Sequence, residues 1–556
     1  MKLISIFFIN IIFLLNSFIA FAFTNVTVKE ALTLTENNKE LIVVDVREID
    51  EFCDEFGHIP CSINYPYNSG VLNERYSELP KDGQILIVCR SGNRSYQVSE
   101  FLTSKGYKNI YNMVGGMSAW EGETAGCEEG TVRECPLPIL YYPHIASSGE
   151  WETEIGLINQ NDSWHLSGIF RAYDRAGNIV SDKLILLSAH SRAEIIVGNE
   201  FPSPQNIAYI TFEPDYDTEL FTGYLKFYQG NQNRAAVPAV KNSEVNKNDI
   251  YISHIASDFN WWTGIAIVNT DSSSRDLTIE FDNGIILQKT IAANAHDSFL
   301  IKDLFDSKPQ ADIHSGIIRG GDGLIGLELF GSTESSGNKC LSGVLLTDDA
   351  NTTLYYPHVA SDEKWWTGIA VFNPSDSENV IVFTPFRADG TALNSEAISV
   401  PILAHSQYSS YFKELYFPDN TAWILAEAES PVVGLQLFGT HGGNEMAGYS
   451  VVDNIQKAGV FFKIEKNGWT GIAFVNTEEE TADIILTAHD NNGNIIASEN
   501  IVLKSYEKRV QMAEDFFTKE NIDAAAYIRF SSDKQTAAFQ LNGSSDGMML
   551  DGLPGR

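Results

Sequence analysis

The stretch Gln84-Ile85-Leu86-Ile87-Val88-Cys89-Arg90-Ser91-Gly92-Asn93-Arg94-Ser95 decides the fold of the N-terminal part of the chain. An apolar run of strand length ends at Cys89, and beyond the loop apolar residues recur at helical spacing from Val98 until Gly106. A buried strand, a tight loop and a helix N-terminus form a bowl in which backbone N–H groups and the helix dipole favour an anion. Such surroundings favour the reactive thiolate form of a cysteine, so we predict chemistry at Cys89.

Further motifs surround this stretch in a fixed order. An apolar run from Leu41 ends in Asp45-Val46-Arg47-Glu48, and Gly57-His58-Ile59-Pro60 and Ile63-Asn64-Tyr65-Pro66 follow it. Gly115-Gly116-Met117-Ser118-Ala119-Trp120 comes after the Cys89 loop. With these pieces, residues 25–125 resemble a single-domain rhodanese, a member of the thiosulfate sulfurtransferase family. The resemblance implies an α/β domain with a parallel sheet and a cysteine that carries sulfane sulfur as a persulfide.

The resemblance also implies roles for single residues. Cys89 would be the nucleophile, and Arg90 and Arg94 would place positive charge near an anionic donor. Asp45, Arg47 and His58 would support the site structurally. The donor would be a small sulfur-containing anion such as thiosulfate, the acceptor would be cyanide or a thiol, and no cofactor or metal is expected. The persulfide would be cradled by the amides of Arg90, Ser91, Gly92, Asn93, Arg94 and Ser95.

The length of the loop separates two chemistries. Four residues lie between Cys89 and Arg94, whereas phosphatases with a similar loop usually hold one residue more in a wider bowl. The shorter loop favours sulfur transfer over phosphoryl transfer. The alternative is a decayed domain in which Cys89 is only a loop residue, and the glycine, the serine and both arginines argue against it.

Length and composition bound the rest of the chain. The 556 residues leave room for roughly four to five domains. A hydrophobic content of 44% with 11% aromatic residues excludes disorder. The net charge of −35, with no basic patch in the sequence, argues against a nucleic-acid partner.

The N-terminus predicts export. Lys2 precedes an apolar run from Leu3 to Ile19, and Ala20-Phe21-Ala22 ends it, which is the order of a secretory signal over residues 1–22. No other segment is apolar enough to span a bilayer, so no transmembrane segment is expected after cleavage. We expect a protein of the periplasm, the cell surface or the extracellular medium.

Export allows disulfides among the six cysteines. Cys89 would stay free, and Cys340 would be structural. The other four cysteines allow three pairings, which the sequence leaves open. One of them lies on the apolar face of a helix expected over 49–56, where a buried thiol is as good an interpretation as a bridge. Another interpretation is a bridge across the linker, at the domain junction. These four residues are Cys53 on the helix, Cys61, and Cys127 and Cys135 at the ends of the linker.

From Pro136 onward the chain repeats itself. Tyr141–Ser147 (YYPHIAS) returns at 251–257 and 355–361, and in a worn form at 460–464. An apolar strand ending in asparagine follows each copy, and the four asparagines are 110, 104 and 103 residues apart. This period indicates tandem whole domains, and the short strands with Asn-Gly and Asp-Gly turns indicate antiparallel β-sandwiches. We predict a signal peptide (1–22), the rhodanese-like domain (23–126), a linker (127–138) and four β-repeats (139–245, 246–350, 351–457 and 458–556).

Histidines recur within the repeats. The motif histidines are His144, His254 and His358, and a second histidine stands in an Ala-His pair at His190, His296 and His405. The fourth repeat has Lys463 and Tyr506 at these two places, which suggests that the places share one environment. A metal site would need a third ligand that does not recur. Hydrogen-bonded histidines at a sandwich edge, or drift in the last copy, are the favoured interpretations.

Paired tryptophans occur at Trp261-Trp262 and Trp365-Trp366, whereas Trp151 and Trp469 stand alone. Exposed pairs of this kind stack on sugars. Because adjacent strand residues face opposite sides, we favour instead one Trp in the core and its neighbour at an edge or an inter-domain contact.

Two classes of function follow from the sequence. The first is an exported sulfurtransferase whose β-repeats position it near a protein or envelope partner. The second is a surface binding or adhesion protein built on the β-repeats, with the rhodanese-like module as a sulfur carrier or redox sensor.

Overall fold

The computed structural model describes residues 23–38, 41–76, 79, 81, 83–127, 137–215, 218–452 and 455–556. The chain divides into two compact units, Met1–Pro136 and Leu137–Arg556. The expected signal (1–22), Cys135 and most of the expected linker lie outside the described residues. Within the described ranges, no helix combines the length and the apolar character needed to cross a membrane.

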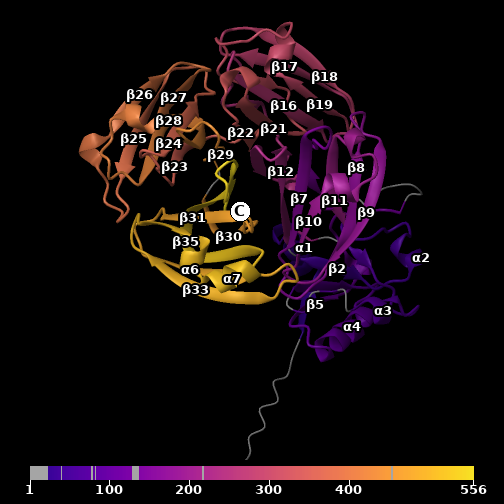
Figure 1. Ribbon diagram of the computed structural model, residues 1–556. Coiled ribbons are helices and arrows are strands. Elements are labelled where there is room, and N and C mark those ends of the chain that lie inside the picture. The colour runs from indigo at the N-terminus through magenta and orange to yellow at the C-terminus, as the bar shows by residue number, and fades with distance from the viewer. Residues whose placement is uncertain are drawn as a thin grey trace, which may run out of the picture. The chain divides into compact units, whose positions relative to one another are not determined.

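The first unit is an α/β domain built on a parallel sheet, as predicted (Figure 1). The strand order is β1-β5-β4-β2-β3, and all four pairings are parallel. Helix α4 packs against the central strands β4 and β5. The strands are β1 (Thr24–Thr27), β2 (Ile42–Asp45), β3 (Ile63–Asn64), β4 (Gln84–Val88) and β5 (Asn109–Val114). The helices are α1 (Val28–Asn37), α2 (Ile49–Phe52), α3 (Val71–Arg75) and α4 (Asn93–Ser104).

One local prediction in this unit is wrong. The apolar spacing predicts a helix over 49–56, but α2 ends at Phe52 after a single turn. Phe52 is buried, whereas Ile49 and Phe56 are exposed. Cys53 is the C-cap of α2 and forms a disulfide, a constraint that the apolar periodicity does not reveal.

The second unit contains four β-sandwich repeats joined in sequence, and all its strand pairings are antiparallel. In the first repeat the two sheets are β10-β7-β12-β13 and β14-β6-β11-β8-β9. Its elements are β6 (Leu140–Tyr142), β7 (Trp151–Asn159), β8 (Leu166–Tyr173), β9 (Ile179–Leu187), β10 (Arg192–Ile196), α5 (Val197–Glu200), β11 (Tyr209–Pro214), β12 (Phe221–Gln229), β13 (Asn233–Pro238) and β14 (Val240–Lys241).

The second repeat has the sheets β15-β20-β17-β18 and β19-β16-β21-β22. Its strands are β15 (Ile250–Ile252), β16 (Trp261–Asn269), β17 (Arg275–Phe281), β18 (Ile286–Ile291), β19 (His296–Leu300), β20 (Gly316–Arg319), β21 (Leu324–Ser332) and β22 (Leu341–Leu345).

The third repeat has β23 (Asn351–Tyr356), β24 (Trp365–Phe372), β25 (Asn379–Phe386), β26 (Ile398–Ile402), β27 (Gln407–Tyr411), β28 (Trp423–Thr440) and β29 (Met446–Ser450). In the third and fourth repeats one long strand, β28 or β35, takes part in both halves of the sandwich.

The fourth repeat completes the unit. Its elements are β30 (Ile455–Phe461), β31 (Gly468–Asn476), β32 (Ala482–His489), β33 (Ile495–Leu503), β34 (Lys508–Met512), α6 (Ala513–Phe516), α7 (Lys519–Ala524), β35 (Tyr527–Ser544) and β36 (Leu550–Pro554).

The recurring asparagines hold each sandwich together. Asn159, Asn269, Asn373 and Asn476 are fully buried at the end of the corresponding strand. Each side-chain amide donates to three backbone carbonyls of the same repeat, as Asn269 does to those of Ser273, Ile291 and Ala292. A buried amide with all its donors satisfied fixes the local chain path, which explains why the residue recurs.

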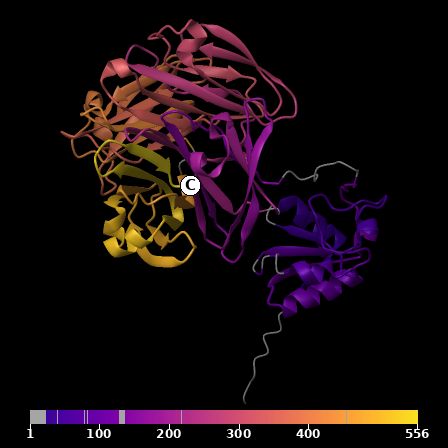
Figure 2. The same cartoon turned by 45° about the vertical axis from the view of Figure 1, so that its right-hand side comes forward.

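The four repeats close into a ring. Their strands β13, β22, β29 and β36 contact one another in turn, and β36 contacts β13. These four strands surround a central cavity of about 100 Å³. Figures 1 and 2 show the repeats following one another around this centre, from magenta through orange to yellow. The ring is not predictable from the period alone, because its closure joins residues more than 300 positions apart, such as Arg234 and Asn542.

We call the contact surface between successive repeats a joint. The residues at the joints show that the predicted equivalence of His190, His296 and His405 is wrong for His296. The residue with left-handed backbone before β10, β27 and β34 is His190, His405 or Tyr506, but before β19 it is Asn294. His296 instead begins β19, in the place of Arg192, Gln407 and Lys508. The shared Ala-His dipeptide led to a shift of two residues, because the sequence does not show which residue takes the positive φ.

Three joints use the same hydrogen bonds. The β10, β19 and β34 strands begin with an amide that donates to the hairpin turn of the neighbouring repeat: Arg192 to Asn491, His296 to Arg175 and Lys508 to Ala388. The left-handed residue accepts a side-chain hydrogen bond across the joint: His190 from Tyr527, Asn294 from Tyr209 and Tyr506 from Trp423. The joint between repeats 2 and 3 has a different hydrogen bond, in which the Gln407 side-chain amide donates to the Ser253 carbonyl.

Glu328 leads to a prediction about stability. It is fully buried, and neither carboxyl oxygen has a hydrogen-bond partner among the described residues, so burial raises the pKa of this carboxyl well above its usual range. The equivalent residues in repeats 3 and 4 are Gln436 and Gln540, whose amides donate to backbone carbonyls. Glu328→Gln should therefore stabilise the second unit by about 1–3 kcal/mol in calorimetry near pH 7.

The pH dependence of that gain is the control. Folded Glu328 keeps its proton, so its contribution to stability is present below the unfolded pKa and is lost as the pH rises through the folded value. The gain from Glu328→Gln should thus shrink near pH 4. An equal gain at both pH values would contradict this explanation.

Candidate active site

Cys89 lies at the carboxyl end of the central strand β4, and its side chain is 1% exposed. The Gly92 amide donates to Cys89 Sγ over 3.1 Å, and Ser95 Oγ lies 3.4 Å from the same sulfur. Gly92 has φ of +94° and is the N-cap of α4, so the amides of the first helical turn have no partner within the helix. The loop thus turns back over the thiol and directs backbone donors and a helix N-terminus toward it.

A second loop braces the first. The Met117 and Ser118 amides donate to the carbonyls of Cys89 and Arg90 over 2.8 and 2.9 Å. Gly116, at φ +58° and ψ −164°, lies so close that a Cβ would come within 2.3 Å of the Cys89 carbonyl oxygen. Only glycine fits this backbone conformation and this approach. The Gly115-Gly116 pair therefore fixes the shape of the Cys89 loop.

Gly116→Ala should accordingly displace the Cys89 loop. We expect a fall in sulfur-transfer activity of about tenfold or more, because a shift of about 1 Å in a catalytic group costs that much or more. The measurement is kcat/KM, together with the rate at which a thiol reagent labels Cys89. Gly126→Ala is the matched control, since a Cβ there meets no atom within 4 Å. Equal activity of the two variants would show that the brace is not needed.

The two arginines of the loop share one carboxylate. Arg94 binds Glu51 through both of its terminal nitrogens, over 2.6 and 2.8 Å, and an Arg90 nitrogen lies 3.9 Å from the same carboxylate. The Arg94 guanidinium holds the pKa of Glu51 below its usual value. The Arg90 side chain is 61% exposed. The expected positive charge is therefore present but partly neutralised, and Arg90 is the freer of the two groups.

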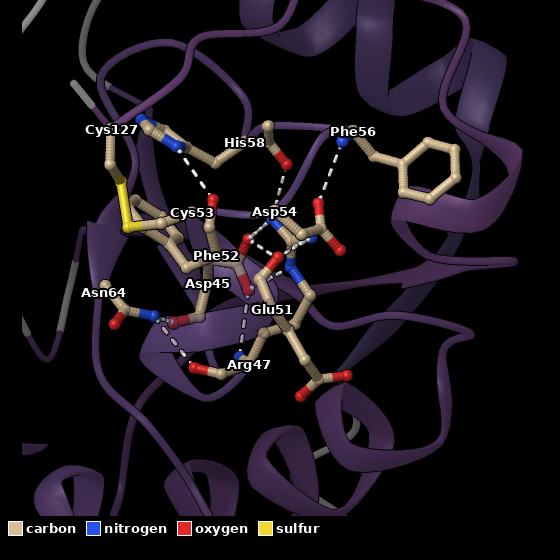
Figure 3. Close-up of a disulfide and its surroundings, with 11 residues drawn as sticks. Asp45, Arg47, Glu51, Phe52, Cys53, Asp54, Phe56, His58, Asn64 and Cys127 are labelled. Carbon is tan, nitrogen blue, oxygen red and sulfur yellow. Dashed lines mark hydrogen bonds and ion pairs between the residues drawn. A yellow bond between two sulfur atoms is a disulfide. The ribbon is translucent and has the colours of Figure 1, made fainter.

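Asp45 and Arg47 form a buried ion pair at the end of β2 (Figure 3). Their side chains form an ion pair of 2.8 Å, and the backbone amide of Arg47 also donates to Asp45. The Arg47 guanidinium further donates to the carbonyls of Glu51 and Gly57. Asp45 is thereby anchored at the end of β2 next to β4, and Arg47 ties α2, which carries Glu51, to this position.

His58 has a structural place in the same region. Its ring stacks on Phe52 at 3.7 Å between centroids, and Nδ1 lies 3.2 Å from the Phe52 carbonyl. Its backbone pairs with Ala125. These contacts connect the segment around Ala125 to α2.

A disulfide strengthens that connection. Cys53, directly after α2, is bonded to Cys127 with the Cα atoms 5.0 Å apart (Figure 3). The suggested bridge between Cys127 and Cys135 is therefore wrong, and so is the interpretation of Cys53 as a free buried thiol. Cys61 is also disulfide-bonded, whereas Cys89 and Cys340 are free and buried.

The structure brings most of the predicted site residues together. Cys89, Gly92 and Ser95 meet at the thiol, and Arg90 and Arg94 meet at Glu51. Ser91 is exposed, and Asn93 accepts a hydrogen bond from Gln97 and faces solvent. Glu51 was missed, because only the folded chain brings it to a loop some 40 residues away. No metal-binding group of three or more side chains is found within the described ranges.

Comparison with known proteins places the first unit in a family. Residues 27–123 match the family model of the rhodanese-like domain. YtwF of Bacillus subtilis (strain 168) is 40% identical over 89 residues, which are 16% of this chain and 82% of the relative. A sulfurtransferase of Allochromatium vinosum is 37% identical over 84 residues, 15% of this chain and 75% of the relative. The crystal structure of a rhodanese-like domain protein from Staphylococcus aureus is 30% identical, with 18% of this chain and 99% of that chain covered and a TM-score of 0.17.

The residues matched by the family model, 27–123, include the Cys89 loop and strands β2 to β5 of the parallel sheet. The family match ends within the first unit, so it bears on the chemistry of the Cys89 thiol and says nothing about the β-ring. Sulfur transfer is the general chemistry of such a unit. Through its N-terminal unit, the chain belongs to the rhodanese-like domain family.

Proposed function

We propose that the protein is an exported sulfurtransferase that moves sulfane sulfur from a donor such as thiosulfate to cyanide or a thiol. The observation that carries the proposal is the Cys89 sulfur, free and held against the Gly92 amide at the N-terminus of α4. Backbone donors around a sulfur stabilise the negative charge of a thiolate and of a persulfide.

The reaction proceeds in two displacements. The Cys89 thiolate attacks the outer sulfur of thiosulfate, the sulfur–sulfur bond of the donor breaks, and sulfite leaves with the electron pair. Cys89 then carries a persulfide anion. An acceptor, either cyanide or a thiolate, attacks the terminal sulfur, forms thiocyanate or a new persulfide, and returns the Cys89 thiolate. No oxidant is consumed in either step.

The loop residues serve these steps in different ways. The Gly92 amide and Ser95 Oγ contact the sulfur itself and stabilise its charge. Arg90 is exposed and attracts an anionic donor, whereas Arg94 is held by Glu51 and keeps α2 against the loop. Asp45, Arg47 and His58 act through the backbone that they fix.

Export is part of the proposal. It is supported by the signal-like order of residues 1–22 and by the Cys53–Cys127 disulfide, since such bonds persist in oxidising compartments. The periplasm, the cell surface and the extracellular medium all meet this condition. The β-ring would hold the sulfurtransferase near a protein or envelope partner.

The decisive experiment compares two cysteine variants of the full chain. Cys89→Ser should lower thiocyanate formation from thiosulfate and cyanide on the order of a thousandfold, because the nucleophile is lost. Mass spectrometry after thiosulfate treatment should find one added sulfur on Cys89 of the wild type. Cys340→Ser is the matched control, because Cys340 is equally buried and free but belongs to the β-ring. Unchanged activity of Cys89→Ser, or no added sulfur on Cys89, would refute the proposal.

A further inference from the structure

The ring contains a cleft at the joint between repeats 1 and 2 that the sulfur chemistry does not use. Its volume is about 860 Å³, within the range of small-molecule sites. Strands β7, β16, β19 and β21 supply its walls, and the β8–β9 turn supplies its rim. The residues that carry the argument are His144, Trp151, Arg175, Trp262, His296 and Asp303, all of which line the cleft.

Two tryptophans form one side of the cleft. Trp151 and Trp262 meet edge to face, with their ring centroids 6.5 Å apart, and both are half-buried. An edge-on contact covers one face of one ring only, so indole surface remains for a ligand. All four paired tryptophans, Trp261, Trp262, Trp365 and Trp366, are half-buried and lie at joints. The predicted inter-domain contact is therefore confirmed, whereas the prediction that one Trp of each pair fills the core is wrong.

Two histidines form the base. His144 Nδ1 and His296 Nε2 lie 3.1 Å apart, so one ring donates the shared proton and the other accepts it. Burial lowers the pKa of His144 to about 4 and lowers that of His296 well below its usual range, which keeps both rings neutral near pH 7. His296 Nδ1 has no hydrogen-bond partner among the described residues. A neutral imidazole pair of this kind presents both a donor and an acceptor, and a hydroxyl group can match either.

The rim of the cleft carries charges of both signs. Arg175 and Asp303 are both exposed there and carry opposite charges. Neither a cluster of cations nor a cluster of carboxylates lines this cleft. This lining favours a neutral ligand that carries hydroxyl groups and offers an apolar face to indole. Carbohydrate rings combine these properties, since their C–H faces lie against aromatic rings while their hydroxyls point sideways.

We propose that the cleft between repeats 1 and 2 binds a neutral glycan, with Trp151 and Trp262 as its stacking surface and the His144–His296 pair as its hydroxyl contact. The joint between repeats 4 and 1 has different residues at these places. There Gly468 and Glu152 replace the two tryptophans, and Lys463 replaces the histidine and pairs with Glu154 over 2.7 Å. The proposal concerns the β-ring alone and does not depend on sulfur transfer.

The chain itself supplies conservative test variants. Trp262→Glu copies Glu152, and His296→Gln copies Gln407 at the same place in repeat 3, so both should fold. Isothermal titration of the full chain with cellotetraose, maltotetraose and chitotetraose, each separately, should detect binding of at least one. Both variants should raise its dissociation constant about tenfold or more, which corresponds to about 1.4 kcal/mol. Trp366→Glu is the matched control at the smaller cleft between repeats 2 and 3 and should leave the constant unchanged.

Three outcomes would overturn the proposal. The first is no heat from any of the three sugars at millimolar concentration with folded protein, as judged by an unchanged melting temperature. The second is equal weakening by Trp366→Glu and Trp262→Glu. The third is binding of a polyproline peptide but of no sugar, because aromatic grooves also take extended proline-rich chains.

Discussion

Arg47→Met should destabilise the first unit by about 3–5 kcal/mol, because the change leaves the buried Asp45 carboxylate without its partner. Asp45 is fully buried, and Arg47 supplies its ion pair and also donates to two backbone carbonyls. Burial raises the pKa of Asp45, an effect that Arg47 opposes, so the loss of the guanidinium favours a protonated or displaced carboxyl. Hydrogen exchange of peptides from residues 41–127, measured on the full chain, should show the loss.

A second variant separates the ion pair from general damage. Arg90→Met removes an exposed guanidinium and should change stability by about 0.5 kcal/mol or less. The double variant Asp45→Leu/Arg47→Met removes both charges and should recover part of the loss, since an apolar pair in place of a buried ion pair is often tolerated. No recovery in the double variant, or equal loss in Arg90→Met, would contradict the role given to the pair.

Acid should weaken the β-ring more than any single substitution. Burial lowers the pKa of His144 and of His254 to about 4, with Arg175 and His314 adding to the effect. The unfolded rings titrate near 6.5, so the neutral folded rings contribute stability above that pH, and it is lost as the pH falls toward 4. Each ring should lower the free energy of unfolding by roughly 3 kcal/mol as the pH falls from about 6.5 to about 4. Urea unfolding of the second unit near pH 7 and pH 4.5 measures the difference.

The control for the acid effect is a double variant. His144→Gln/His254→Gln removes both titrating rings and keeps a neutral hydrogen-bonding side chain at each place. Its stability should change less between the two pH values than that of the wild type, by several kcal/mol. Equal pH dependence of both proteins would assign the acid effect to other groups, such as the buried imidazole of His489, whose pKa burial lowers to about 4.

The strand, loop and helix that surround Cys89 were predictable because contiguous residues form them. The run into Cys89, the positive-φ Gly92 and the helix after it follow one another within a dozen positions, and the structure has them in that arrangement. Glu51 was not predictable, since nothing in its own surroundings marks a carboxylate that binds Arg94. The role of Gly116 depends on a close approach of two loops, which a single glycine in sequence does not reveal.

The β-repeats show a similar division. The short strands and turn signals predicted the sandwich class, and the strand-ending asparagines predicted the repeat period, because both patterns act within one repeat. The contacts between repeats could not be predicted from the sequence, because each joint is made by residues more than 80 positions apart. Examples are Tyr209 with Asn294 and Trp423 with Tyr506. The misplaced His296 has the same cause. The prediction aligned the repeats by their shared Ala-His dipeptide, whereas the structure shows that the left-handed residue of the second repeat is Asn294.

Closure of the ring has a mechanical consequence. Linear repeat arrays fray from their terminal members, which have a neighbour on one side only. Here the first and last repeats lie against each other through buried ion pairs such as Lys226–Asp551, so every member is flanked twice. A protease that attacks transiently opened chain ends finds no weak outer member, and degradation has to await rupture of two joints at once.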